Sequence, residues 1–457
     1  MDRILFIGNS FTYYNDMPSL FSALCDSAGV PVHVERIVKG GWYLSRYADP
    51  EDEMYPAIAE AAKQEWDYII LQDQSINPAI HKETFLAACK SLAAMFTCRK
   101  KFVMYQTWAY EDGSCKLADT GFTYEEMHEK LREAYREAAD ALHALCVPAG
   151  DAFRLAHDQY YYKFDLYRAD AFHPGILGSY MIACTFFGML TGKSPMECIT
   201  PAGVDKNHAH SLRKMAHDAC FADQKAISIL HVGNSHTYFN DLPAMVAEMA
   251  HFAGVPVSSY RVVKGGWKLC QHADPECETH AALLKARDMK HWDYIVLQEN
   301  STVLATEDES FFKALDALKA LLGDHCKTFA LYQTHSFAKG SNKLRELELS
   351  YDEMYEKLRA AYHKAQPMLN AVLIPSGDGF AQMTRCHGRE EMVIHDGVHA
   401  SPAGTYLAAC LHCAALLKLD PLTLKTMECV DEPLAAMIRQ AAHDVMFPAP
   451  QEEEIHA

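Results

Sequence analysis

Polar and apolar positions follow two alternating patterns along the chain. Short apolar runs rich in β-branched and aromatic residues are separated by stretches in which apolar residues recur every three or four positions, as in 124–145. The first pattern predicts buried strands and the second predicts amphipathic helices. Strands that alternate with helices indicate an α/β fold with a parallel sheet covered on both faces. In the first half, the predicted strands are Ile4–Ile7, Val32–Ile37, Tyr68–Leu71, Lys101–Tyr105 and Cys146–Pro148.

The chain also repeats itself. Three segments of the first half return in the second half at an offset of 225 or 226 residues: ILFIGNSFTYYNDMP (4–18) as ILHVGNSHTYFNDLP (229–243), VKGGW (38–42 and 263–267), and WDYIILQDQS (66–75) as WDYIVLQENS (292–301). This period is far longer than a solenoid repeat, so we interpret it as the tandem duplication of a whole domain. The expected domains are residues 1–224, the first copy, and 225–457, the second copy.

Composition narrows the classes of partner. The 457 residues include 42 Lys and Arg against 60 Asp and Glu, a formal net charge of −18. This charge repels phosphate backbones and anionic lipids, so we expect neither nucleic acid nor a membrane as a partner. No apolar run approaches the roughly 18–20 residues that span a bilayer. Because the chain opens directly on an apolar strand rather than a targeting segment, we expect a cytoplasmic protein. Its oligomeric state stays open.

Metal and cofactor motifs are missing from the sequence. The fifteen cysteines are scattered, and the one C-x-x-C, Cys410 to Cys413, lies in a helical stretch without a second pair. We therefore expect reduced thiols and no metal. The chain has no phosphate-binding glycine loop, zinc-protease motif or dinucleotide fingerprint, so we expect no cofactor.

The residues that follow the predicted strands recur in both copies. Ligands of parallel sheets bind beyond the carboxyl ends of the strands, so these residues are candidates for chemistry. Gly8-Asn9-Ser10 follows the first strand and returns at 233–235. A serine exposed on such a turn suits a nucleophile. Asn and Ser are also common helix caps, so this motif alone does not decide between the two roles.

Two further strand ends could stabilise negative charge or bind a sugar. Paired glycines let the backbone approach a ligand, side-chain amides can point at an oxyanion, and a tryptophan can stack on a sugar ring. Each is equally ordinary as a loop glycine, a polar strand end or a core aromatic. The positions are Gly40, Gly41, Gln74 and Trp42 in the first copy and Gly265, Gly266, Asn300 and Trp267 in the second.

An Asp-x-x-His motif stands late in each copy, Asp170 to His173 and Asp396 to His399. An aspartate three residues before a loop histidine can orient its ring, which is what a serine nucleophile needs from its base. Among 24 histidines, one such spacing is weak evidence. The recurrence of all four elements, in the same order, in two copies is much stronger evidence than any one of them.

Together these elements resemble the SGNH (GDSL-type) hydrolases. The strings FIGNSFTYYND, LQDQS and D-x-x-HP are most similar to an uncharacterised bacterial branch in which G-N-S replaces the usual G-D-S. The resemblance covers both halves of the chain. It implies two tandem flavodoxin-like three-layer α/β/α domains, each with about five parallel strands, and metal-free esterase chemistry on acyl or acetyl groups.

The resemblance also implies roles for residues. It implies that Ser10 and Ser235 are the nucleophiles and that His173 and His399 are the general bases. It also implies that Asp170 and Asp396 orient these histidines. The oxyanion hole would combine the serine amides, an amide from each glycine pair, and the side chain of Gln74 or Asn300. The family's third block is normally G-x-N-D, so only the second copy keeps the asparagine. Because a donor displaced by about 1 Å can cost roughly a hundredfold in rate, we expect the second site to be the more competent.

The expected function is hydrolysis of O-acyl esters, chiefly O-acetyl esters, of a carbohydrate or small molecule. A non-catalytic carbohydrate-binding protein on the same scaffold is the alternative, and a thioesterase or lipase would need an acyl tunnel. The copies differ beside the serine, with Phe11 against His236 and Trp108 against His335. We therefore expect different pockets, the second more polar.

Overall fold

The computed structural model describes residues 1–96, 101–158, 164–222, 224–388 and 390–448. Two compact units contain them. Of the described residues, one unit comprises 1–158, 164–205, 211–222 and 224, and the other comprises 206–210, 225–388 and 390–448.

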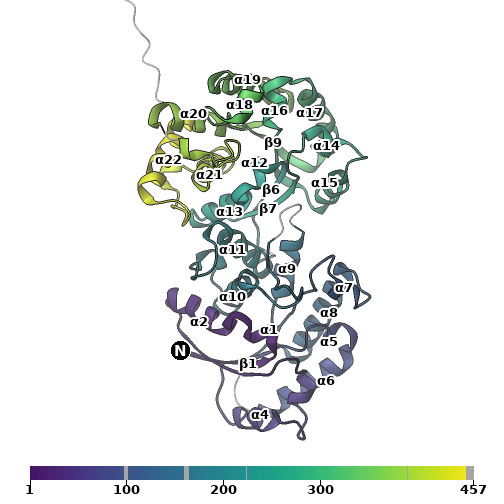
Figure 1. Ribbon diagram of the computed structural model, residues 1–457. Coiled ribbons are helices and arrows are strands. Elements are labelled where there is room, and N and C mark those ends of the chain that lie inside the picture. The colour runs from purple at the N-terminus through teal and green to yellow at the C-terminus, as the bar shows by residue number, and fades with distance from the viewer. Residues whose placement is uncertain (97–100, 159–163, 223, 389, 449–457) are drawn as a thin grey trace, which may run out of the picture. The chain divides into compact units, whose positions relative to one another are not determined.

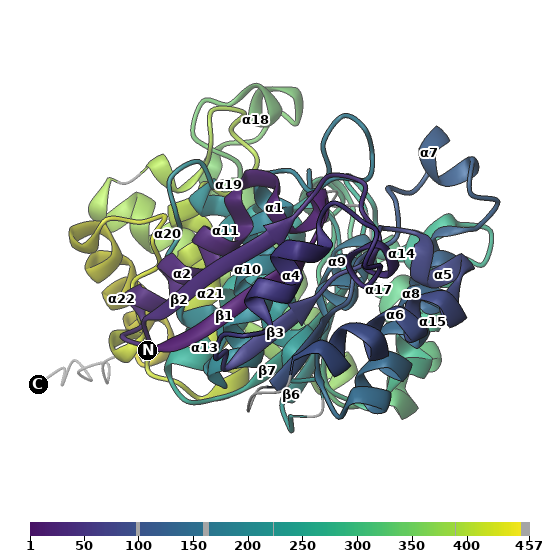
Figure 2. The ribbon, with the colours of Figure 1, turned by 90° about the horizontal axis from the view of Figure 1, so that it is seen from below.

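Each unit is built on a five-stranded parallel sheet (Figures 1 and 2). The strand order is β2-β1-β3-β4-β5 in the first unit and β7-β6-β8-β9-β10 in the second, the same order by position in the repeat. Every pair of neighbouring strands is parallel. This order is that of flavodoxin-like folds, so the predicted α/β architecture is confirmed. The strands are β1 Asp2–Gly8, β2 Val32–Val38, β3 Tyr68–Leu71, β4 Lys101–Tyr105, β5 Leu145–Val147, β6 Ile227–Gly233, β7 Val257–Val263, β8 Trp292–Leu297, β9 Cys326–Tyr332 and β10 Val372–Ile374.

Helices connect the strands. Those of the first copy are α1 Ser10–Tyr13, α2 Met17–Ser27, α3 Leu44–Tyr47, α4 Tyr55–Ala61, α5 Asn77–Ile80, α6 Lys82–Met95, α7 Cys115–Ala118, α8 Tyr124–Leu142, α9 Ala149–His157, α10 Ile176–Thr191 and α11 Lys206–Cys220. Those of the second copy are α12 Ser235–Tyr238, α13 Leu242–Phe252, α14 Leu269–Ala273, α15 Glu278–Met289, α16 Ser301–Thr306, α17 Glu309–Leu322, α18 Asn342–Glu346, α19 Tyr351–Leu369, α20 Ser376–His387, α21 Pro402–Leu417 and α22 Glu432–Met446.

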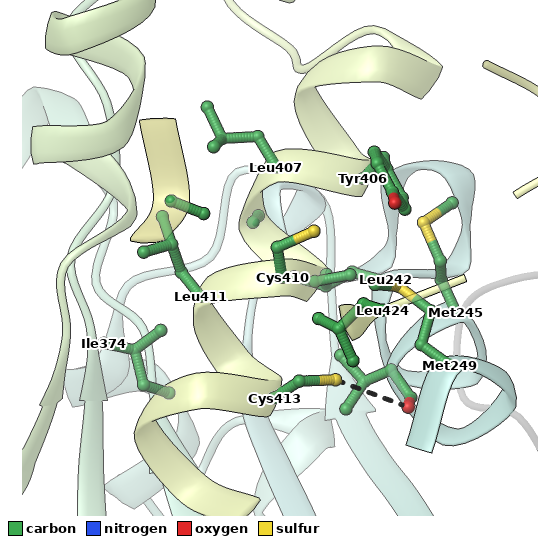
Figure 3. Close-up of a cluster of buried hydrophobic side chains, with 14 of the residues drawn as sticks. Leu242, Met245, Met249, Ile374, Tyr406, Leu407, Cys410, Leu411, Cys413 and Leu424 are labelled. Atoms are coloured by element: carbon green, nitrogen blue, oxygen red, sulfur yellow. Dashed lines mark hydrogen bonds between the residues drawn. The ribbon is translucent and has the colours of Figure 1, made fainter. Parts of the chain in front are cut away.

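The core of the second unit has two parts, one on each face of the sheet. Ile229 of β6 belongs to a buried cluster with side chains of α13 and α21, whereas the next residue, Leu230, belongs to a cluster with side chains of α17 and α19. Figure 3 shows labelled side chains of α13 and α21 from the first cluster. Successive side chains of a strand point to opposite faces. Helices therefore cover both faces of this sheet, as the continuous apolar runs predict.

The predicted elements differ from the observed ones mainly at their ends. The helical pattern over 124–145 becomes α8, which starts at a capping box between Thr123 and Glu126 and ends where His143 adopts a φ of 47°. A left-handed residue at this position terminates a helix. β5 ends at Val147 rather than Pro148, because proline has no N–H to donate to a neighbouring strand.

Within the described residues, no helix is both long enough and apolar enough to span a membrane.

Candidate active site

The two candidate nucleophiles occupy the same position in the fold. Ser10 is the first residue of α1, directly beyond β1, and Ser235 is the first residue of α12, directly beyond β6. Ser235 is buried and Ser10 is partly exposed. Both serines thus lie at the carboxyl end of a central strand, where parallel sheets bind ligands.

The asparagine before each serine caps the helix and also ties two loops together. Asn9 Oδ1 accepts a hydrogen bond from the amide of Phe11 (3.1 Å), and Asn9 Nδ2 donates one to the carbonyl of Trp42 (2.9 Å). Asn234 makes the equivalent pair in the second copy, with distances of 3.1 and 2.9 Å. An aspartate could accept the first bond but could not donate the second. This gives a physical reason for G-N-S in place of G-D-S.

The structure brings each serine together with the predicted histidine and aspartate. In the first copy, His173 Nε2 lies 2.7 Å from Ser10 Oγ, and His173 Nδ1 lies 2.8 Å from Asp170 Oδ2. In the second copy, His399 makes the same contacts, at 2.8 Å to Ser235 Oγ and 2.6 Å to Asp396 Oδ2. These distances are within hydrogen-bond reach for a nucleophile, its base and the group that orients the base.

Each aspartate is held ionised by its own loop. Asp170 Oδ1 accepts hydrogen bonds from the amides of Phe172 (3.3 Å) and His173 (3.0 Å). Burial opposes the charge of Asp170, but the hydrogen bonds from the His173 ring and from these amides outweigh it and hold the pKa of Asp170 below its usual value. The pKa of Asp396 is lowered for the same reasons. An ionised aspartate keeps the proton on Nδ1 and directs the lone pair of Nε2 to the serine.

A second asparagine holds the histidine loop against the serine helix. Asn15 Nδ2 donates to the carbonyl of Pro174 (2.9 Å) and to Ser179 Oγ (2.8 Å). Asn240 repeats this with Ala400 (3.1 Å) and Thr405 (2.8 Å). Pro174 and Ala400 directly follow the two histidines, so the bond fixes the distance between the two loops. Sequence reasoning missed these residues, although their recurrence as Y-x-N-D in both copies was an available signal.

The third strand contributes a glutamine that positions the serine turn. Gln72 Oε1 accepts from the amide of Asn9 (2.9 Å) and from Thr12 Oγ1 (2.8 Å). Gln298 makes the same contacts in the second copy, both at 2.9 Å. A Cβ on Gly8 would lie 2.5 Å from Gln72 Oε1, so only glycine allows this close approach. Gln72 and Gln298 therefore act through the backbone, unlike the amide donors expected from this block.

The paired glycines form a tight turn after β2 and β7. The amide of Trp42 donates to the carbonyl of Lys39 (3.1 Å), and Gly41 has a φ of 74°, as the third residue of a type II turn requires. The equivalent bond in the second copy, from Trp267 to Lys264, is also 3.1 Å. Among the described residues, Gly40, Gly41, Gly265 and Gly266 have no intramolecular acceptor for their amides. These amides are available to a ligand oxygen.

The two candidate side-chain donors of the oxyanion hole lie in different surroundings. Asn300 Nδ2 donates to the carbonyl of Gly266 (3.0 Å), which brings this side chain against the glycine turn. Gln74 Nε2 instead donates to its neighbour Ser75 Oγ (2.9 Å). The oxyanion assignment of Gln74 and Asn300 stays a prediction.

A buried carboxyl group supports each of these loops. Asp73 Oδ1 accepts from the amides of Leu44 (2.8 Å) and Gln74 (2.7 Å). Glu299 accepts from Leu269 (3.2 Å) and Asn300 (2.6 Å) in the same way. Burial raises the pKa of Asp73, and it raises the pKa of Glu299 to about 7 against the lowering effect of these bonds. Each carboxyl group joins the loop after the second strand to the loop after the third.

The two tryptophans differ in how far their rings are covered. Lys39 Nζ and Arg46 Cζ lie 3.6 and 3.5 Å from the ring centroid of Trp42. Two cations so close to one centroid occupy opposite faces, so the expected sugar platform of Trp42 is covered. Trp267 carries Lys264 at 3.6 Å, and glutamine replaces Arg46 at the equivalent position, 271. A stacking role is therefore better suited to Trp267.

Comparison with known proteins gives matches only among solved structures. No family model and no curated protein matches the chain. A protein from Slackia heliotrinireducens, described as "a putative SGNH hydrolase", is 30% identical over 42% of this chain and 100% of its own, with a TM-score of 0.37. A DUF4886 family protein from Bacteroides uniformis is 22% identical over 49% of this chain and 96% of its own, with a TM-score of 0.43.

An acetylxylan esterase from Geobacillus stearothermophilus is 12% identical over 42% of this chain and 94% of its own, with a TM-score of 0.34. The identity to the Slackia protein extends over that protein's whole length, which is about one domain of the present chain. The solved structures that this chain resembles are thus hydrolase-like proteins, and the resemblance covers 42–49% of the chain.

Proposed function

We propose that the chain is a serine esterase with one Ser-His-Asp triad in each copy, acting on O-acyl esters, chiefly O-acetyl esters, of a carbohydrate or other small molecule. The observation that carries the proposal is the pair of matching hydrogen-bond chains. The distance from serine Oγ to histidine Nε2 is 2.7 Å in the first copy and 2.8 Å in the second. The distance from histidine Nδ1 to aspartate Oδ2 is 2.8 Å in the first copy and 2.6 Å in the second. Two copies that differ at many other positions keep this arrangement.

The reaction begins with attack of serine Oγ on the ester carbonyl while histidine Nε2 accepts the serine proton. The new imidazolium is stabilised by the aspartate on Nδ1. The tetrahedral oxyanion receives hydrogen bonds from the serine amide and the free glycine amides, each worth about 3 kcal/mol when well placed. The imidazolium then protonates the leaving alcohol. Water repeats these steps on the acyl-enzyme, which releases the acid and restores the serine.

The test is release of p-nitrophenol from p-nitrophenyl acetate by the wild type, Ser10→Ala, Ser235→Ala and the double variant. We expect each single variant to keep the activity of the other site and the double variant to lose at least about a thousandfold, because only binding and the oxyanion hole remain. The matched control is Ser19→Ala, an exposed serine of α2, which should leave the rate unchanged. Full activity in the double variant would refute the nucleophile assignment.

A fluorophosphonate probe followed by peptide mapping gives a second, independent readout. We expect covalent labelling of Ser10 and Ser235 and of no other serine. If neither serine is labelled while the protein still binds glycans, the protein is a carbohydrate-binding protein on the same scaffold. Activity that rises steeply with acyl chain length would instead indicate a thioesterase or lipase.

A further inference from the structure

A row of aromatic rings leads inward from the catalytic histidine in the first copy. The ring of Phe11 lies 5.4 Å from that of His173 and is stacked on Trp108 at 4.7 Å. Trp108 is in turn stacked on Phe153 at 4.4 Å, and its Nε1 donates to the carbonyl of Phe172 (3.0 Å). Every polar atom of this row is satisfied, so the region beside the first triad is apolar.

The second copy replaces two of these rings by imidazoles. His236 stands at the position of Phe11, 5.7 Å from the ring of His399, and His335 stands at the position of Trp108, 5.1 Å from His236. His335 is stacked on Phe380 at 4.1 Å, as Trp108 is on Phe153. Val398 replaces Phe172. The row is therefore retained, but its side chains are smaller and carry four ring nitrogens.

Hydrogen bonds fix which of those nitrogens carry protons. His335 Nδ1 lies 2.9 Å from the carbonyl of Ser336, and a carbonyl only accepts, so Nδ1 carries the proton and Nε2 has a lone pair. Ser301 Oγ donates to Thr334 Oγ1 (2.9 Å), so this hydroxyl accepts from His236 Nε2 (3.3 Å). The proton of His236 is thus on Nε2, and its Nδ1 also has a lone pair.

Both lone pairs lack a partner in the described part of the chain. His236 Nδ1 and His335 Nε2 are buried and make no hydrogen bond there. Burial lowers the pKa of His236 well below its usual value and lowers that of His335 to about 4, so both rings are neutral acceptors. A buried polar atom without a partner is unfavourable, because it has lost its hydrogen bond to water. A hydrogen-bond donor on a bound ligand would satisfy these two atoms.

We propose that the second site takes esters whose acyl chain carries a hydroxyl group, whereas the first site takes unsubstituted acyl chains. This inference rests on the proposed esterase function. His236 is buried and its ring lies 5.7 Å from that of His399, so we assign the acyl group to this side of the site, because the alcohol has to leave toward solvent. A hydroxyl donates the hydrogen bond that His236 Nδ1 and His335 Nε2 can accept, and the aromatic row of the first copy offers no such acceptor.

The experiment measures kcat/KM for phenyl 3-hydroxybutyrate and phenyl butyrate, with each site isolated by Ser10→Ala or Ser235→Ala. The measured quantity is the ratio of the hydroxylated to the plain ester. We expect this ratio to be at least about tenfold higher at the second site, since one hydrogen bond to a buried acceptor is worth about 1.4 kcal/mol. Equal ratios at two working sites would overturn the inference.

Two variants of near-equal size test the acceptor itself in the Ser10→Ala background. His335→Leu removes the acceptor, and we expect the ratio of the hydroxylated to the plain ester to fall about tenfold. His335→Gln keeps an acceptor oxygen and should retain most of the preference. An unchanged ratio in folded His335→Leu, checked by its circular dichroism, refutes the inference.

The two levels of the proposal fail in different ways. If neither serine reacts with the fluorophosphonate probe and neither isolated site cleaves either ester, the esterase proposal fails and the inference falls with it. If Ser235 reacts with the probe but the ratio is no higher at the second site than at the first, only the inference is wrong.

Discussion

The two copies share the framework of the site but not the interior behind it. The capping asparagines, the glutamines of the third strand and the loop-bridging Asn15 and Asn240 make the same hydrogen bonds in both copies. Where the residue type changes within this framework, the bond is kept. Tyr47 donates to the carbonyl of Gly8 (2.6 Å), and the equivalent His272 lies 2.9 Å from that of Gly233.

The interior differs in kind. The second copy has buried histidines at positions where the first has Phe6, Phe11, Tyr47, Trp108 and Phe186. The positions of the serine, histidine and aspartate are therefore set by hydrogen bonds from side chains to backbone groups at the strand ends. The packing behind them can therefore change without moving the three residues.

The largest expected effect is on the shared framework. We expect Asp170→Asn in the Ser235→Ala background to lower kcat by about 10³–10⁴-fold, because the amide no longer holds the histidine in the right tautomer. Asp396→Asn in the Ser10→Ala background should have the same effect. Steady-state hydrolysis of p-nitrophenyl acetate measures this, with the exposed Asp119→Asn as control. A loss in only one copy would mean that the two triads are not equivalent, and a loss below about tenfold in both would contradict the aspartate role.

Acid should destabilise the second copy more than the first. Burial lowers the pKa of His272, His335 and His412 to about 4. In the unfolded chain, these histidines protonate near pH 6.5. Their contribution to the stability of the second copy is therefore complete above pH 6.5 and is lost as the pH falls toward 4. Each of these groups then costs about 2 kcal/mol at pH 5.

The buried carboxyl groups act in the opposite direction. Because the pKa of Glu299 is raised to about 7, its contribution to the stability of the folded second copy is lost as the pH rises from about 4.5 to 7. The pKa of Asp73 is also raised, so it changes the stability of the first copy in the same direction. In the first copy, burial also lowers the pKa of His128. The additional buried histidines therefore make the second copy the less stable one in acid. Hydrogen exchange measured by mass spectrometry at pH 5 should show the second copy losing protection before the first. Equal loss in both copies would contradict this.

Removing the bond between the loops should have an intermediate effect. Asn15 and Asn240 have φ angles of 52° and 49°, so Asn15→Gly and Asn240→Gly keep the backbone conformation while they delete the side-chain bonds. We expect kcat at the affected site to fall about 10–100-fold, because the histidine is no longer held at the serine. The other site in the same protein serves as the internal control. Equal losses at both sites from one substitution would indicate general destabilisation instead.

The smallest effect concerns the residue directly after the aspartate in each Asp-x-x-His motif. Ala171 and Gly397 both have positive φ, 63° and 72°. Gly397→Ala would place its Cβ 2.7 Å from Ser341 Cβ, and we expect a loss of about 1 kcal/mol or more in unfolding free energy. Ala171→Gly should change stability by less than about 1 kcal/mol, because relief of backbone strain offsets the greater freedom of the unfolded chain. Urea denaturation monitored by fluorescence compares the two, and similar losses for both would show that the loops are not alike.

Much of the fold and the three candidate catalytic residues of each copy could be predicted from the sequence. Buried strands and long amphipathic helices have strong local patterns, and the repeat shows which strand-end residues recur. The roles of Gln72 and Asn15 could not be read in this way, because their partners lie about 60 and 160 positions away and the bonds go to backbone groups of any residue type. The coverage of Trp42 by Arg46 likewise depends on side-chain directions that spacing does not reveal.

The contact between the start and the end of each copy also has a consequence for synthesis on the ribosome. Ser10 and His173 are 163 positions apart, and Asn15 and Ser179 close the same long loop. The first triad can therefore form only after the start of α10 has left the exit tunnel. Domains fold as units during synthesis. The first site is accordingly able to mature while most of the second copy is still untranslated, so a truncated nascent chain ending soon after α11 is the earliest product expected to react with a serine-directed probe.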